Sequence, residues 1–145
     1  MIDPMLAISI RPGQSDEAAA LADLSTQLGY PSDAETMRER LMQVRDAGAG
    51  EVFVAVDAAS AVLGWTHVVP RLHIEEVPFA ELAGLVVGDS ARSRGIGALL
   101  LRAAEDWARN RGFARLRVRS NVVRERAHRF YLREGYIEQI GRAHV

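Results

Sequence analysis

The chain has 145 residues, of which 48% are hydrophobic and 26% charged, and its formal net charge is −1. This length and composition predict one soluble globular domain spanning residues 1–145. The near-zero net charge gives no reason to expect nucleic acid or an anionic membrane as a partner. No apolar run approaches a membrane span and no segment resembles a signal peptide, so a cytoplasmic location is expected.

The chain contains no cysteine. This excludes disulfides, thiolate metal ligands and a cysteine nucleophile. The four histidines, at positions 67, 73, 128 and 144, are not spaced as metal ligands, so no metal site is expected.

The first half of the chain predicts a strand, two helices and a pair of antiparallel strands. Alternating side chains favour a strand over residues 7–11, and Leu21, Leu24 and Leu28 form one face of a helix. A capping box at residues 32–35 begins the second helix. The apolar runs 51–56 and 62–69 then predict two strands.

The second half alternates strands with helices. The predicted elements are strands over residues 79–87, 114–121 and 136–140, and helices over residues 96–111 and 124–134. This order of elements by itself indicates only an α/β or α+β protein.

A loop between the strand 79–87 and the helix 96–111 carries the strongest chemical signal. Its sequence is Arg92-Ser93-Arg94-Gly95-Ile96-Gly97. Two glycines let the backbone approach a ligand closely, and the N–H groups at a helix start bind anions. These features predict a phosphate site. The alternative is a glycine-containing turn with solvated arginines.

The identity of the phosphate ligand follows from the spacing. A P-loop is excluded because no lysine follows Gly97, and a dinucleotide fingerprint is excluded because position 100 is leucine. The pattern Arg-x-x-Gly-x-Gly after an apolar strand resembles the acetyl-CoA loop of the GCN5-related N-acetyltransferases (the GNAT family). The resemblance extends over most of the chain.

The resemblance implies the acyl-CoA N-acyltransferase fold, an α/β (α+β) architecture with a mixed, mostly antiparallel sheet and helices on both faces. In that fold the strands ending at Val87 and Asn121 run parallel and splay apart, and the pantetheine arm of acetyl-CoA enters the gap. The implied cofactor-binding residues are Leu85, Val86, Val87, Arg92, Ser93, Arg94, Gly95, Ile96, Gly97, Ala98, Asn121 and Tyr131. For Asn121 the alternative role is a helix cap or turn.

Glu81 is the first predicted catalytic residue. Strand alternation predicts that it shares a face with Ala83, Leu85 and Val87. The segment Phe79-Ala80-Glu81-Leu82 resembles the histone acetyltransferase branch, in which this glutamate is the general base. The alternative is a glutamate that orients the substrate or lies exposed, without a role in proton transfer.

Tyr131 is the second predicted catalytic residue. Residues 127–136 resemble the family segment Ala-x-x-Phe-Tyr-x-x-x-Gly-Phe, whose tyrosine protonates the departing sulfur of the cofactor. The alternative is a tyrosine that only packs in the core.

The resemblance therefore implies an acetyl-CoA-dependent N-acetyltransferase that transfers acetyl directly to a primary amine, of a small molecule, in a ternary complex. The alternatives are a non-catalytic acyl-CoA-binding or regulatory module and a protein N-acetyltransferase. Five carboxylates are predicted beside the acceptor site: Asp33, Glu35, Glu75, Glu76 and Glu81. They would favour a cationic amine; the alternative is a solvated acidic surface. Homodimerisation through the terminal strand, which Gly141 interrupts, is a further expectation.

Overall fold

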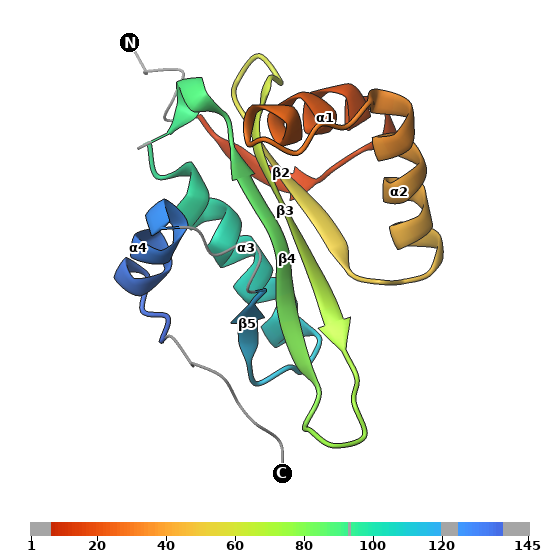
Figure 1. The fold of residues 1–145 in the computed structure, drawn as a ribbon, viewed down its shortest axis with the longest axis vertical. Helices are drawn as coiled ribbons and strands as arrows, with labels where there is room; N and C mark the ends of the chain where they lie inside the picture. Colours follow the sequence, from red (N-terminus) through yellow and green to blue (C-terminus); the bar gives the residue numbers. More distant parts are fainter. Residues whose placement is uncertain (1–6, 93, 120–124, 138–145) are drawn as a thin grey trace.

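The computed structural model describes residues 7–92, 94–119 and 125–137. Five strands form one sheet in the order β1-β2-β3-β4-β5, and four α-helices lie against it (Figure 1). The strands are β1 (Ser9–Pro12), β2 (Glu51–Val56), β3 (Val62–Arg71), β4 (Phe79–Val87) and β5 (Leu116–Val118). The helices are α1 (Ala18–Gln27), α2 (Ala34–Asp46), α3 (Ile96–Asn110) and α4 (Glu125–Arg133).

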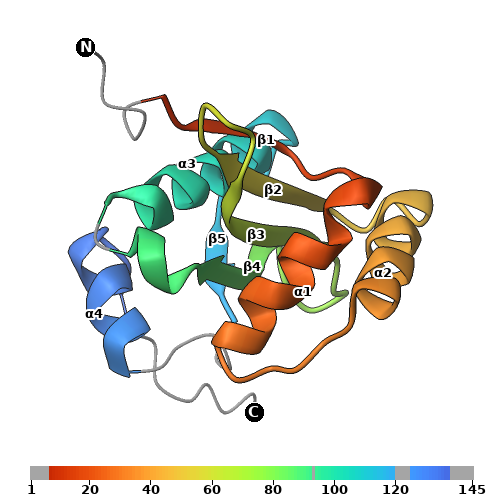
Figure 2. The same ribbon diagram turned by 90° about the horizontal axis from the view of Figure 1, so that it is seen from above.

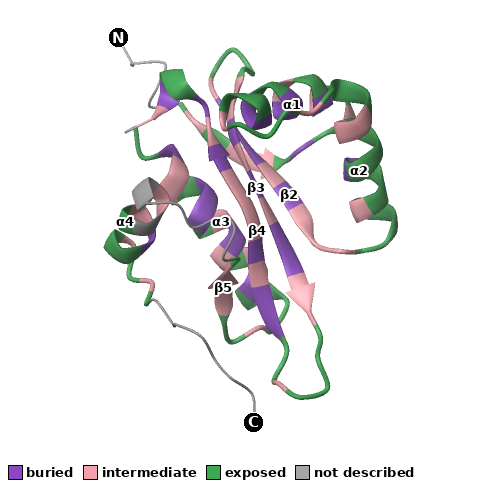
Figure 3. Cartoon of the chain, viewed as in Figure 1, coloured by how far each residue is buried: buried purple, intermediate pink, exposed green. Residues whose placement is uncertain are grey.

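The sheet is antiparallel from β1 to β4, and β5 pairs parallel to β4. Apolar helix faces cover it from two sides, α1 and α2 on one face and α3 and α4 on the other (Figure 2). Leu21 of α1 and Leu41 of α2 pack with Val54 of β2, whereas Leu101 of α3 and Tyr131 of α4 pack in a second cluster with β3 and β4. The buried side chains accordingly lie between the layers (Figure 3). The predicted architecture is confirmed.

Several predicted boundaries differ from those in the structure. β3 continues through Pro70 to Arg71, and β5 is confined to Leu116–Val118. The N-cap of α2 is Asp33, whose carboxylate accepts a hydrogen bond from Thr36 N at 2.7 Å, so the predicted capping box at residues 32–35 is wrong. Tyr136 and Ile137 lie outside any strand, and the rest of the predicted terminal strand lies outside the described residues.

A bulge in β4 changes which side chains share a face. Leu82 pairs with Val68 and Gly84 pairs with His67, so Ala83 is an extra residue on β4. Beyond the bulge the alternation is reversed, and Leu85 packs toward α3, on the same face as Leu82. The prediction that Glu81 shares a face with Leu85 and Val87 is therefore wrong.

Polar contacts hold α4 and the segment after it on α3. The Tyr136 hydroxyl donates to Glu105 Oε2 at 2.8 Å, and Arg102 bridges Glu105 and Glu134 at 3.2 and 3.1 Å. Burial and the hydrogen bond to Glu105 both raise the pKa of Tyr136, so its hydroxyl remains a donor at neutral pH. These contacts fix the position of α4 beside the sheet.

Replacing Tyr136 with phenylalanine should destabilise the fold by about 1–2 kcal/mol, because Glu105 loses a part-buried donor but keeps Arg102. Thermal unfolding measures this loss. Asp106→Asn is the matched control on the same helix, because the Arg109–Asp106 pair is exposed at both ends and should contribute less than about 0.5 kcal/mol. Equal losses in the two variants would show that the Tyr136 hydrogen bond does not anchor α4.

Candidate active site

The edge of β4 is open where β5 stops. The two strands pair only between Ala80–Leu82 and Leu116–Val118, and the last bond runs from Arg119 N to Leu82 O at 3.1 Å. Farther along, Gly88 N donates to Leu63 O of β3, so the alternation of the strand turns the polar backbone groups of Leu85 and Val87 to the open edge. An extended ligand bound along this edge could hydrogen-bond to them as an added strand.

A cleft of about 1380 Å³ passes through this opening. Its lining combines both sides of the sheet: residues from α1 and α2, the middle of β3, the second half of β4, the first turn of α3, and α4. The cleft therefore gives two ligands, one from each side, access to the same short stretch of β4.

The loop before α3, which the sequence predicts to bind phosphate, contributes Arg92, Gly95 and Gly97 to the cleft. Gly95 is the N-cap of α3 in the left-handed region, with φ of 77°, and no side chain of the described residues caps the helix. A Cβ on Gly97 would lie 3.3 Å from the Phe130 ring, so a side chain here would press on that ring. The N–H groups of the first turn and the helix dipole favour an anion here.

Most of the predicted cofactor residues come together in the cleft. Its lining includes Leu85, Val86, Val87, Arg92, Gly95, Ile96, Gly97, Ala98 and Tyr131. The guanidinium of Arg92 is also paired with Asp89 at 3.0 Å. Arg94 is not part of this lining, and Ser93 and Asn121 lie outside the described residues.

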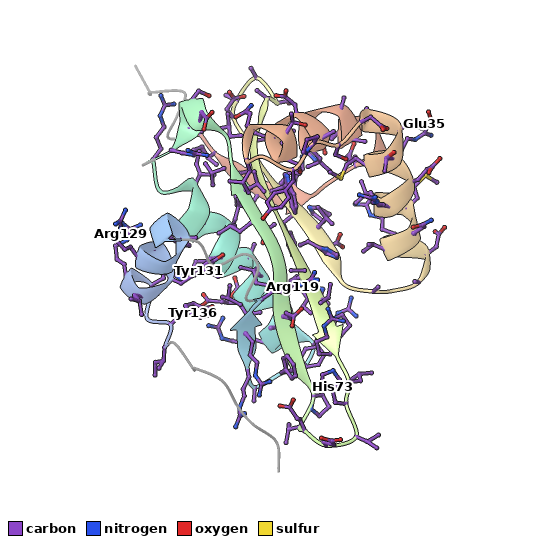
Figure 4. The ribbon with its side chains drawn as sticks, in the orientation of Figure 1. Glu35, His73, Arg119, Arg129, Tyr131 and Tyr136 are labelled. Carbon is purple, nitrogen blue, oxygen red and sulfur yellow. The ribbon has the colours of Figure 1, made fainter. Side chains whose placement is uncertain are left out.

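Tyr131 projects from α4 toward the sheet (Figure 4) and is only 5% exposed. Its ring packs in the cluster of Leu82 and Leu101 and makes an edge contact with Phe130, with ring centroids 5.1 Å apart. Burial raises the pKa of the Tyr131 hydroxyl well above its usual value, so the group keeps its proton and can donate it.

The predicted acidic residues do not surround the cleft. Glu81 Oε1 is paired with Arg71 at 3.0 Å, and Glu76 is paired with Arg117 at 2.8 Å. Glu35 points outward from α2 (Figure 4). None of the five carboxylates lines the cleft, so their place beside an acceptor site stays a prediction. The positions of these carboxylates in the sequence did not show which way their side chains point.

Trp65, His67 and Arg119 line the cleft without having been predicted there. Gly84 leaves room for the Trp65 ring, because a Cβ at Gly84 would come within 2.8 Å of it. Burial lowers the pKa of His67, and its Nε2 is buried with no hydrogen-bond partner among the described residues. The alternation of β3, which places Trp65 and His67 on one face, is the signal that could have identified the first two.

No helix in the described part of the chain is long and apolar enough to cross a membrane. Residues 7–92, 94–119 and 125–137 also contain no group of three histidine, aspartate or glutamate side chains placed to hold a metal ion.

The sequence model of the acetyltransferase (GNAT) family matches residues 18–136. An aminoglycoside N(6′)-acetyltransferase type 1 of Stenotrophomonas maltophilia is 32% identical over 136 residues, which are 91% of this chain and 88% of that protein. An aminoalkylphosphonate N-acetyltransferase of Salmonella typhimurium is 38% identical over 76 residues, or 52% of this chain and 49% of that protein.

Solved structures show the same fold at lower identity. The aminoglycoside N-acetyltransferase AAC(6′)-Iy, crystallised with CoA, superposes with a TM-score of 0.81 at 18% identity, covering 95% of this chain and 93% of that one.

Proposed function

The chain belongs to the GNAT family of acetyltransferases, and from that premise we propose that it acetylates a primary amine of a small molecule by direct transfer from acetyl-CoA. The observation that carries the proposal is the cleft, which reaches the open edge of β4 from both sides of the sheet. Two substrates can therefore meet there in one ternary complex. The chain has no cysteine to form an acetyl-enzyme.

The residues of the cleft fit acetyl-CoA. The first turn of α3 offers N–H groups to the pyrophosphate, and Gly95 and Gly97 leave room for it. The backbone groups of Leu85 and Val87 are available to the amide groups of the pantetheine arm, as in β-strand pairing. The N–H of Val87 would then polarise the thioester carbonyl, and Tyr131 would protonate the departing sulfur.

The charge of the cleft bears on the class of amine. Among the described residues, no aspartate or glutamate lines the cleft. Five arginines line it: Arg40, Arg92, Arg119, Arg129 and Arg133. A substrate with several positive charges would find no carboxylate to replace its lost hydration. We therefore propose an amine whose other groups are neutral or anionic, which agrees with the aminoalkylphosphonate relative better than with the aminoglycoside relatives.

A steady-state assay of thiol release with three acceptors tests this selectivity. At low salt, kcat/KM for 2-aminoethylphosphonate or ethanolamine should exceed that for kanamycin by at least about tenfold, which corresponds to 1.4 kcal/mol. Salt should reduce the difference because it screens the charges. Preference for kanamycin would contradict the proposed class of substrate and leave the N-acetyltransferase assignment intact.

The same assay separates the proposed activity from its alternatives. Thiol release that depends on a small amine supports the enzyme. Binding of acetyl-CoA without turnover of any amine would indicate an acyl-CoA-binding module, and turnover of peptide amines alone would indicate a protein N-acetyltransferase.

A further inference from the structure

One side chain in the cleft differs from the rest in being able to accept a proton near neutral pH. Among the described residues that line it, the ionisable side chains are arginines, Tyr30, Tyr131 and His67. Arginine stays protonated at all relevant pH values, and tyrosine is already protonated near pH 7. A group that removes a proton from the acceptor amine must lie within reach of it. Of the ionisable described residues that line the cleft, His67 is the one that can accept a proton near pH 7.

His67 lines the part of the cleft on the α1 and α2 side of the sheet, level with the bulge of β4. It pairs with Val52 of β2 and with Gly84 of β4, at the bulge from which β4 continues along its open edge. Its side chain shares a face with that of Trp65, which packs against the α1 and α2 cluster. The imidazole therefore lies on the α1 and α2 side of the sheet, across from Tyr131 on the α4 side.

The hydrogen bonding of His67 fixes the form of the ring. The imidazole bonds to the backbone of Ala49, and Nε2 has no partner among the described residues. Nδ1 is then the N–H donor to the Ala49 carbonyl, which leaves a lone pair on Nε2. Burial, the largest effect, and the charge of Arg71 lower the pKa of His67, and together they outweigh the hydrogen bond to Ala49 and the charge of Glu51, which raise it, so the ring is neutral near pH 7. Arg40 of α2, which lines the same cleft, also disfavours a positive charge there.

We propose that His67 Nε2 accepts the proton that the acceptor amine loses when it is acetylated, an inference that rests on the proposed N-acetyltransferase function. In this step the amine nitrogen bonds to the acetyl carbonyl carbon and the carbon–sulfur bond breaks. One N–H proton passes to His67 Nε2, and the Tyr131 hydroxyl gives its proton to the sulfur. After the products leave, the imidazolium releases a proton to solvent and the tyrosinate takes one up.

Glu81 is the competing candidate on the same face of the sheet. It pairs with Val69, two residues beyond His67 along β3, and its carboxylate is engaged by Arg71. His67 is thus level with Gly84, beyond the point where β5 stops, whereas Glu81 lies where β4 still pairs with β5. A neutral imidazole is basic enough for the task, because the nitrogen becomes far more acidic once it has attacked the carbonyl.

The test compares His67→Ala, His67→Gln and Glu81→Gln, using the better of ethanolamine and 2-aminoethylphosphonate as acceptor. His67→Ala should lower kcat by about 10²-fold or more, the effect typical of a lost general base. The affinity for acetyl-CoA should stay within about twofold. Added imidazole should restore part of the activity in proportion to its neutral fraction. His73→Gln is the control, because His73 lies on the exposed hairpin between β3 and β4 (Figure 4).

The pH profile distinguishes a proton acceptor from a structural residue. In the parent enzyme kcat should fall as pH drops through the lowered pKa of His67, and His67→Gln should lose that limb. Should His67→Ala not fold, as judged by circular dichroism and acetyl-CoA binding, His67→Gln carries the test. A pH-independent loss without imidazole rescue, or a loss confined to Glu81→Gln, would overturn the inference. Failure of the parent enzyme to turn over any amine would instead contradict the proposed function.

Discussion

Tyr131→Phe should lower kcat by about 10²–10⁴-fold, the range typical of a lost general acid. The affinity for acetyl-CoA should remain nearly unchanged, because the substitution removes one hydroxyl and keeps the ring that packs against Leu82, Leu101 and Phe130. Steady-state kinetics and calorimetric titration with acetyl-CoA measure the two quantities. In Tyr131→Phe the sulfur leaves without a proton donor, and its departure then limits kcat.

Raising the pH should not rescue Tyr131→Phe, because more neutral amine does not supply the missing proton. Tyr136→Phe is the matched control: it removes a tyrosine hydroxyl from the same region, where that hydroxyl contacts Glu105. This control should keep kcat within about threefold at a temperature where it is folded. Near-normal turnover of Tyr131→Phe would assign the tyrosine to packing.

Gly95→Leu should remove most of the thermal stabilisation that acetyl-CoA gives to the protein. At a concentration of 100 times the dissociation constant, binding contributes about 2.7 kcal/mol to stability. Gly95 has φ of 77° at the start of α3, so leucine forces the backbone out of the conformation that presents the first-turn N–H groups. Its side chain also occupies the phosphate end of the cleft.

Gly112→Leu is the control for backbone strain. Gly112 has φ of 82° and, like Gly95, has no atom within 4 Å of an added Cβ, but it follows the other end of α3. Both variants should lose similar intrinsic stability, and only Gly95→Leu should lose the response to acetyl-CoA. Melting curves recorded with and without acetyl-CoA separate the two effects. An unchanged response in Gly95→Leu would exclude this loop as the phosphate site.

The local sequence determined much of the fold and the proposed cofactor half of the site. The nearly continuous apolar run gave β2 with its observed ends, because strands buried on both faces need apolar residues at nearly every position. The loop before α3 was identifiable because its glycines, helix start and preceding strand are adjacent in the sequence. Anion binding at a helix N-terminus is itself a local property.

Only the tertiary structure reveals the residues of the proposed acceptor half. The extra residue Ala83 reverses the alternation of β4, and it is visible only in the pairing with β3. Arg71 engages Glu81 across two strands, while His67 is brought to the cleft by its position between β2 and β4. Burial, hydrogen-bond partners and the sign of the charge in a cleft arise from residues far apart in the sequence. Periodicity reports only which residues share a face while the alternation is unbroken.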